Sequence, residues 1–197
     1  ALERGEFELH YQPRISVADG AACGIEALIR WRHPERGLIL PDEFIPVAED
    51  TGLIVPIGEW VIQEACRQNM AWCEAGLPRL PVAVNLSPRQ FRQSNLVETV
   101  VRALDRHGCP SELLELEITE GVLMQETADT LQTLEALNKL GVGLAIDDFG
   151  IGYSSLSYLK RFPVDCLKID QSFVRDVTVD PDDAAIVTAI IGLAHSL

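Results

Sequence analysis

Acidic and amide side chains stand at the ends of several short apolar runs of this chain. All of them offer oxygen atoms, the ligands that Mg2+ and Mn2+ prefer. Carboxylates that gather at one place repel one another unless a cation joins them. A single such acid is most often a solvated or capping side chain, but several at the ends of four strands predict a divalent-metal site. The candidate ligands are Glu26, Asn85, Glu117, Asp147 and Asp148.

The adjacent pair Asp147-Asp148 is expected to serve two metal ions. Neighbours on a strand point to opposite faces, so both reach one site only where the strand has ended. The segment Phe149–Gly152 follows directly, and its two glycines permit such a turn. Two-metal sites stabilise the attacking and leaving oxygens of phosphoryl hydrolysis. A glycine-flanked loop at this place could also close over a substrate.

Other charged residues near these acids each allow two interpretations. Lys168 and Asp170 alternate at the end of their apolar run and so share a face. The lysine orients a water or steadies phosphate charge, or else it forms a structural salt bridge. Arg30 shares a strand face with Glu26. It either binds a phosphate group through two guanidinium N–H groups or is an ordinary surface arginine. Glu120 caps the next helix or braces the loop after the aspartate pair, and we favour bracing.

These residues need elements that position them, and strand-length apolar runs alternate with helical stretches along the chain. The predicted strands are Phe7–Pro13, Gly24–Arg30, Pro81–Asn85, Leu113–Ile118, Gly143–Asp148 and Cys166–Asp170. The predicted helices are Ile57–Glu74, Pro88–His107, Glu126–Leu140, Ser154–Lys160 and Asp182–Leu197.

Strand–helix alternation predicts an α/β fold with a largely parallel sheet and helices outside it. Asp19-Gly20 lies between the first two runs and predicts a hairpin there. An open doubly wound sheet and a (β/α)8 barrel both fit, but polar residues at several strand ends favour the barrel. A barrel usually needs about 250 residues. We therefore expect a chain of 197 residues to lack the C-terminal strands.

Composition narrows the partners and the compartment. The net charge of −14 argues against a nucleic-acid polymer as partner, because phosphate repels such a chain. This acidity reflects either a solvated surface or carboxylates that converge on cations. Apolar runs are too short for a membrane span, and no signal-peptide pattern occurs. The odd number of cysteines, five, and the lack of CxxC predict reduced core thiols and a cytoplasmic location.

Read together, the motifs of this chain resemble the EAL domain of bacterial cyclic di-GMP phosphodiesterases. The match covers essentially the whole chain in the order of the family, which makes it specific. The motifs are Tyr11-Gln12-Pro13, Glu26-Ala27-Leu28, Arg30-Trp31, His33-Pro34, Phe44-Ile45-Pro46, Ala48-Glu49, Asn85-Leu86-Ser87, Glu117-Ile118-Thr119-Glu120, Asp147-Asp148-Phe149-Gly150 and Leu167-Lys168-Ile169-Asp170.

The resemblance implies a modified (β/α)8 TIM-type barrel with an antiparallel first strand, as one domain over residues 1–197 that is incomplete at its C-terminus. It implies hydrolysis of cyclic di-GMP to the linear dinucleotide by a two-metal mechanism with two Mg2+ or Mn2+ ions. A homodimer is the family expectation, and fused sensor or diguanylate cyclase domains are plausible partners.

Residue roles also follow from the resemblance. Glu26, Asn85, Glu117 and Asp147 match metal ligands, and Asp148 is shared with or serves a second metal. Lys168 matches the residue that positions the attacking water, Asp170 an acid near it, and Glu120 the anchor of the loop after Asp148. Gln12, Leu28 and Arg30 match contacts to the dinucleotide.

Two departures leave alternatives open. Ile151 stands where the family usually has threonine, and a further family glutamate would lie beyond Leu197. A non-catalytic cyclic di-GMP receptor therefore remains an alternative to the phosphodiesterase, and an unrelated metal-dependent barrel hydrolase is a third. The intact set of metal ligands favours the enzyme, because receptors of this fold tend to lose them.

Overall fold

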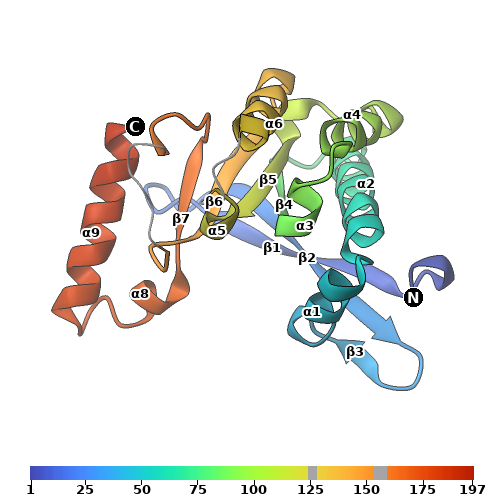
Figure 1. Ribbon diagram of the computed structural model, residues 1–197, viewed down its shortest axis with the longest axis horizontal. Helices are drawn as coiled ribbons and strands as arrows, with labels where there is room; N and C mark the ends of the chain where they lie inside the picture. The colour runs from blue at the N-terminus through green and yellow to red at the C-terminus, as the bar shows by residue number, and fades with distance from the viewer. Residues whose placement is uncertain (124–127, 153–158) are drawn as a thin grey trace. The chain divides into compact units, whose positions relative to one another are not determined.

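The chain folds into two compact units in a computed structural model, which describes residues 1–123, 128–152 and 159–197 (Figure 1). The first unit is Ala1–Leu116 and the second is Glu117–Leu197. Strand β5 (Leu114–Thr119) crosses from one unit to the next. Strands occur at all six predicted places, and the sheet is mixed.

The first unit contains a mixed sheet covered by helices. Strand β2 pairs antiparallel with β1 and β3 and parallel with β4. Short β3 follows β2 directly and was not predicted. The elements of this unit before β5 are η1 (Leu2–Arg4), β1 (Phe7–Ile15), β2 (Ala22–His33), β3 (Gly37–Ile39), α1 (Pro41–Thr51), α2 (Ile54–Glu74), β4 (Val82–Leu86), α3 (Pro88–Phe91), α4 (Leu96–His107) and η2 (Ser111–Leu113).

The antiparallel first strand predicted from Asp19-Gly20 is confirmed. Gly20 has φ 72°, a left-handed conformation that glycine adopts without steric cost. Asp19 accepts a hydrogen bond through Oδ1 from the amide nitrogen of Ala21, at 3.1 Å. The resulting register places Gln12 of β1 opposite Glu26 of β2.

The predicted helix Pro88–His107 is wrong in one respect, because it consists of two helices, α3 and α4. Ser87 and Gln90 form a capping box at the start of α3. The chain leaves the helical path before Asn95, in a run of polar residues that compete for backbone hydrogen bonds. Helix α4 ends where predicted, with Gly108 at φ 60°.

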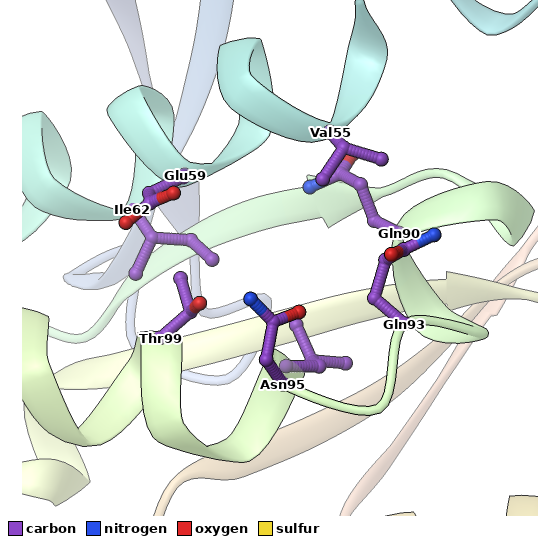
Figure 2. A pocket seen from close by; sticks show the side chains of 8 residues that line it. Val55, Glu59, Ile62, Gln90, Gln93, Asn95 and Thr99 are labelled. Atoms are coloured by element: carbon purple, nitrogen blue, oxygen red, sulfur yellow. The ribbon is translucent and has the colours of Figure 1, made fainter. Parts of the chain in front are cut away.

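Helix α2 packs on α4 and β4, and a small cavity separates it from α3 and α4 (Figure 2). The cavity volume is about 20 Å³, with Val55, Glu59, Gln90 and Thr99 among the lining residues. A space of this size suits a single water molecule. It is far below the several hundred Å³ of a typical ligand pocket, so we assign it no substrate.

The second unit begins with Glu117 and carries a parallel strand pair, β6 and β7. Helix α9 lies beside β7 and contacts α8 (Figure 1). The predicted helix Ser154–Lys160 lies mostly outside the described residues, as do the first two residues of Glu126–Leu140. The elements after β5 are α5 (Glu120–Leu123), α6 (Ala128–Leu140), β6 (Gly143–Phe149), β7 (Cys166–Ile169), α8 (Gln171–Arg175) and α9 (Pro181–Ser196).

The cysteines are free, as predicted, but they do not all lie in the core. Cys66 and Cys109 are buried, whereas Cys23 is exposed on β2. The Cys109 thiol raises the pKa of Cys66, and burial adds to this shift. Helices of the described part of the chain are all too short or too polar to cross a membrane.

Candidate active site

Glu26 and Asn85 lie on neighbouring strands of the first unit. Strands β2 and β4 run parallel, with Glu26 opposite Ala83. The side-chain amide nitrogen of Asn85 donates to Oε1 of Glu26 at 3.0 Å. The amide nitrogen of Asn85 can only donate and is occupied by Glu26. The carbonyl oxygen of Asn85 is therefore its candidate metal-binding atom. Two oxygen-bearing side chains thus meet in this unit.

The expected substrate contacts of the first unit share the strand face of Glu26. Leu28 and Arg30 follow Glu26 at intervals of two on β2, and Gln12 is the cross-strand neighbour of Glu26 on β1. Arg30 is half-buried and donates from Nη1 to the carbonyl oxygen of Ile29 at 2.8 Å. The face therefore combines an acid, an amide and a guanidinium, which suits a polar, phosphate-bearing ligand.

Glu117, Asp147 and Lys168 form an ion-paired cluster in the second unit. Nζ of Lys168 lies 2.6 Å from Oε2 of Glu117 and 3.1 Å from Oδ2 of Asp147. Glu117 is 1% exposed, while Lys168 and Asp147 remain partly open to solvent. An ionised carboxylate this deeply buried requires a cationic or hydrogen-bonding partner, and Lys168 provides one.

A β-bulge sets both aspartates of strand β6 opposite Lys168 of strand β7. Ile146 pairs with Leu167 and Phe149 with Ile169, so two residues of β6 stand opposite one of β7. Asp148 has φ 53°, the left-handed region that aspartate tolerates better than most residues. Strand β6 continues one residue past the predicted end at Asp148, to Phe149, so both aspartates still lie within the strand.

Asp148 and Asp170 differ in their electrostatic environments. Burial raises the pKa of Asp148, and the charges of Asp147 and Asp170 raise it further. The pKa of Asp170 is lowered because the hydroxyl and backbone amide of Ser172 donate to its carboxylate. Asp170 is thereby the N-cap of α8. Ser172 was not singled out from the sequence, although an aspartate such as Asp170 directly before a helix is a capping signal.

Glu120 braces the loop after the aspartate pair, which is the alternative favoured above. Its Oε2 accepts from the backbone amide of Gly150 at 3.0 Å and from that of Gly152 at 3.1 Å. Glu120 is 3% exposed. A Cβ at Gly152 would lie 2.9 Å from the Glu120 carboxylate, so glycine allows this close approach. Ile151 between them is exposed and its side chain leaves these bonds intact.

The candidate ligands therefore fall into two groups, one in each unit. Within the described residues, no three acidic, histidine or cysteine side chains are gathered closely enough to form a metal site. A cavity of about 560 Å³ lies in the second unit between the end of β6 and α9, lined by Glu120 and mainly by apolar residues. The described carboxylate cluster around Lys168 does not line it.

Fold and donor chemistry together define the class. The chain is an α/β protein with a mixed sheet, an antiparallel first strand and acidic residues on strands β2, β5 and β6. The model of the EAL domain family matches residues 1–197, which is the whole chain. The chain belongs to the EAL domain family, whose fold is a TIM-like barrel.

Several relatives carry names that describe their activity. The chain is 51% identical over 197 residues to the bifunctional diguanylate cyclase/cyclic di-GMP phosphodiesterase MucR of Pseudomonas aeruginosa, covering 100% of this chain and 29% of MucR. It is 47% identical over 197 residues to the cyclic di-GMP phosphodiesterase NbdA of the same organism, covering 100% of this chain and 25% of NbdA. The chain thus spans less than a third of the length of these relatives.

A solved structure of the MucR phosphodiesterase in complex with cyclic di-GMP has the same fold. It superposes with a TM-score of 0.95 at 51% identity, covering 100% of this chain and 79% of that one. A high score at this identity confirms the predicted fold class.

Proposed function

We propose that this chain is a metal-dependent phosphodiesterase domain that hydrolyses cyclic di-GMP to the linear dinucleotide. The observation that carries the proposal is the pair of carboxylates, Glu117 and Asp147, held by Lys168, with Asp148 next to Asp147 on the same strand. Family membership supports the substrate, because named relatives act on cyclic di-GMP and a solved relative contains it. A chain of net charge −14 needs local cations to receive an anionic dinucleotide, and metals would supply them.

The proposed metal ligands fit a hard divalent cation. All of them provide carboxylate or amide oxygens. Because the amide nitrogen of Asn85 is bonded to Glu26, its carbonyl oxygen is the atom that would bind the metal. When bound, two Mg2+ or Mn2+ ions would activate the attacking water and neutralise charge on the phosphate. We propose that the ligands of these ions are Glu26, Asn85, Glu117, Asp147 and Asp148.

Other side chains of the chain would orient the reacting groups. Lys168, held by Glu117 and Asp147, would orient the attacking water with its ammonium group. Asp170, two residues later in the chain, would lie near this water. Glu120 would keep the loop after Asp148 in place through the Gly150 and Gly152 amides. These assignments rest on position and on the family, and each is a proposal for mutagenesis.

Substrate contacts are proposed on the first unit. Arg30 would pair with a phosphate of cyclic di-GMP, since its guanidinium is the planar fork that phosphate oxygens match. Gln12 would hydrogen-bond the dinucleotide, and Leu28 would pack against it. All three share the strand face of Glu26 in β1 and β2.

The cellular setting is also a proposal. Free cysteines at every cysteine position support a reducing compartment such as the cytoplasm. Multidomain relatives support fusion to sensor or diguanylate cyclase domains, because the chain covers only 29% of MucR. A homodimer is our expectation from the family and needs a measurement of mass in solution.

Turnover is the decisive experiment. The protein is incubated with cyclic di-GMP and Mn2+, and the linear dinucleotide is quantified by chromatography. We expect product from the wild type and from Asp105→Ala, an exposed change on α4. Asp147→Ala should form no product while keeping its circular dichroism spectrum. Binding of cyclic di-GMP without product from the wild type would replace the enzyme by the receptor alternative, and activity of Asp147→Ala would refute the metal role of Asp147.

A further inference from the structure

The Lys168 ammonium occupies the oxygens that the proposed metal would need. Nζ contacts Oε2 of Glu117 at 2.6 Å and Oδ2 of Asp147 at 3.1 Å, which are hydrogen-bond distances for an ammonium group. A divalent cation bound between the same two carboxylates would meet a positive charge at close range. Both cations cannot keep these oxygens at the same time without strong repulsion.

The strand pairing places Lys168 close to the aspartate pair of β6. The β6–β7 bulge sets this one residue opposite the Asp147-Asp148 step. Glu117 is 1% exposed, so its carboxylate cannot be stabilised by bulk water. Lysine has a flexible four-carbon stem, unlike the rigid guanidinium fork of arginine, so it can withdraw from a site without moving the backbone.

We propose that Lys168 is an internal counter-ion that exchanges with a divalent cation. The ammonium group holds Glu117 and Asp147 together, and a metal that binds there displaces it from at least one carboxylate. The displaced ammonium then lies beside the metal, where it can act on water or phosphate. This inference rests on the proposed metal role of Glu117 and Asp147, and it assigns Lys168 a positioning role beyond that function.

Exchange predicts that the metal compensates for loss of the lysine. Without metal, Lys168→Met leaves the buried Glu117 carboxylate without its ammonium partner, so the melting temperature should fall well below that of the wild type. Saturating Mn2+ should remove most of this difference, because the metal replaces the lost charge. The Mn2+ concentration for half-maximal stabilisation should be lower in the variant by about tenfold, since no internal cation competes.

The test uses thermal unfolding of the purified chain, first with EDTA and then across a Mn2+ titration. Lys139→Met, an exposed change on α6, is the matched control and should follow the wild type throughout. Lys168→Arg keeps the charge and should remain stable with EDTA. An equal loss of stability in Lys168→Met with and without Mn2+, or an unchanged half-maximal concentration, would overturn the exchange and leave a structural ion pair.

A measurement on the unmodified side chain covers the case in which Lys168→Met does not fold. The ¹⁵N-labelled ammonium signal of Lys168, assigned by its loss in Lys168→Arg, is followed as diamagnetic Mg2+ is added. We expect it to shift as the bonds to Glu117 and Asp147 are released, whereas an unchanged signal at saturating Mg2+ would refute exchange. If neither Mg2+ nor Mn2+ binds the wild type at all, the metal site itself fails, and the proposed function fails with it.

Discussion

Gly58 of α2 allows Gln90 of α3 to approach the helix backbone, and an added methyl group should break this contact. A Cβ at position 58 would lie 1.7 Å from Nε2 and 2.2 Å from Cδ of Gln90. Gln90 is 5% exposed, so its side chain has little room to move away. Its Oε1 accepts from the backbone amide of Ser87 at 3.2 Å. Gly58→Ala therefore tests whether this packing holds the start of α3.

The magnitude follows from three opposing terms. Overpacking of a well-filled interior costs about 1–3 kcal/mol. Loss of the capping-box bond to Ser87 adds about 1 kcal/mol. Alanine in a helix interior is better than glycine by about 1 kcal/mol, which offsets part of the loss. We expect Gly58→Ala to lower the free energy of unfolding by roughly 1–3 kcal/mol.

A double-mutant cycle with Gln90→Ala isolates the contact. Gln90→Ala alone loses the capping arm, but with it removed the methyl group at position 58 finds space. The two changes should therefore be strongly non-additive, with a favourable coupling of about 1–3 kcal/mol. Urea unfolding of the wild type, both single variants and the double variant measures this coupling. Additive effects, or a Gly58→Ala variant as stable as the wild type, would refute the close approach.

Gly192 of α9 provides the matched control. It is also a helical glycine, but a Cβ added there would meet nothing within 4 Å. Gly192→Ala should leave stability unchanged or raise it by up to about 1 kcal/mol, because only the helix propensity changes. A loss as large as that of Gly58→Ala would mean that the cost arises from something other than the clash.

Two further predictions concern the hydrogen-bonded carboxylates Glu120 and Glu6. Glu120→Gln replaces the charge-assisted bonds to the Gly150 and Gly152 amides by neutral ones that are weaker by about 1 kcal/mol each, so hydrogen exchange at these two amides should accelerate, and an unchanged rate would contradict the bracing. The pKa of Glu6 is lowered to about 2, first because Arg4 donates to it. Because the folded pKa lies below the ordinary value of 4.5, this stabilisation is complete above pH 4.5 and is lost towards pH 2. An NMR titration in which Arg4→Ala fails to raise this pKa would refute the cause.

Six of the strands were predictable from the sequence because each contains an apolar run and is four to twelve residues long, whereas β3 has only three residues and was missed. The hairpin between the first two strands followed from local turn chemistry, with Asp19-Gly20 as the signal. The break between α3 and α4 was not predictable from apolar spacing, because that spacing continues across Gln93 and Asn95. Capping at Ser87 was foreseen, whereas its partner Gln90 depends on the glycine of a distant helix.

The β-bulge shows the limit of the period-two rule for strands. Alternation alone places Asp147 and Asp148 on opposite faces, so the sequence predicted that both reach one site only where the strand ends, at Asp148. The extra residue lies in the pairing of β6 with β7, a non-local property that neither strand encodes by itself. The one local signal is the residue type at position 148, because aspartate tolerates the left-handed φ that the bulge requires there better than most residues do.

The β5–α5 turn of the second unit organises the aspartate segment from two sides. Glu117 is near the end of β5 and Glu120 is the first residue of α5, three positions later. Glu117 reaches Lys168, which also contacts Asp147, while Glu120 reaches the amides that follow Asp148. One turn thus fixes both the charge partner before the bulge and the backbone after it. Because both acids are buried, a shift of this turn would disturb the carboxylates around Lys168 and the loop after Asp148 together, so the geometry of this turn controls both.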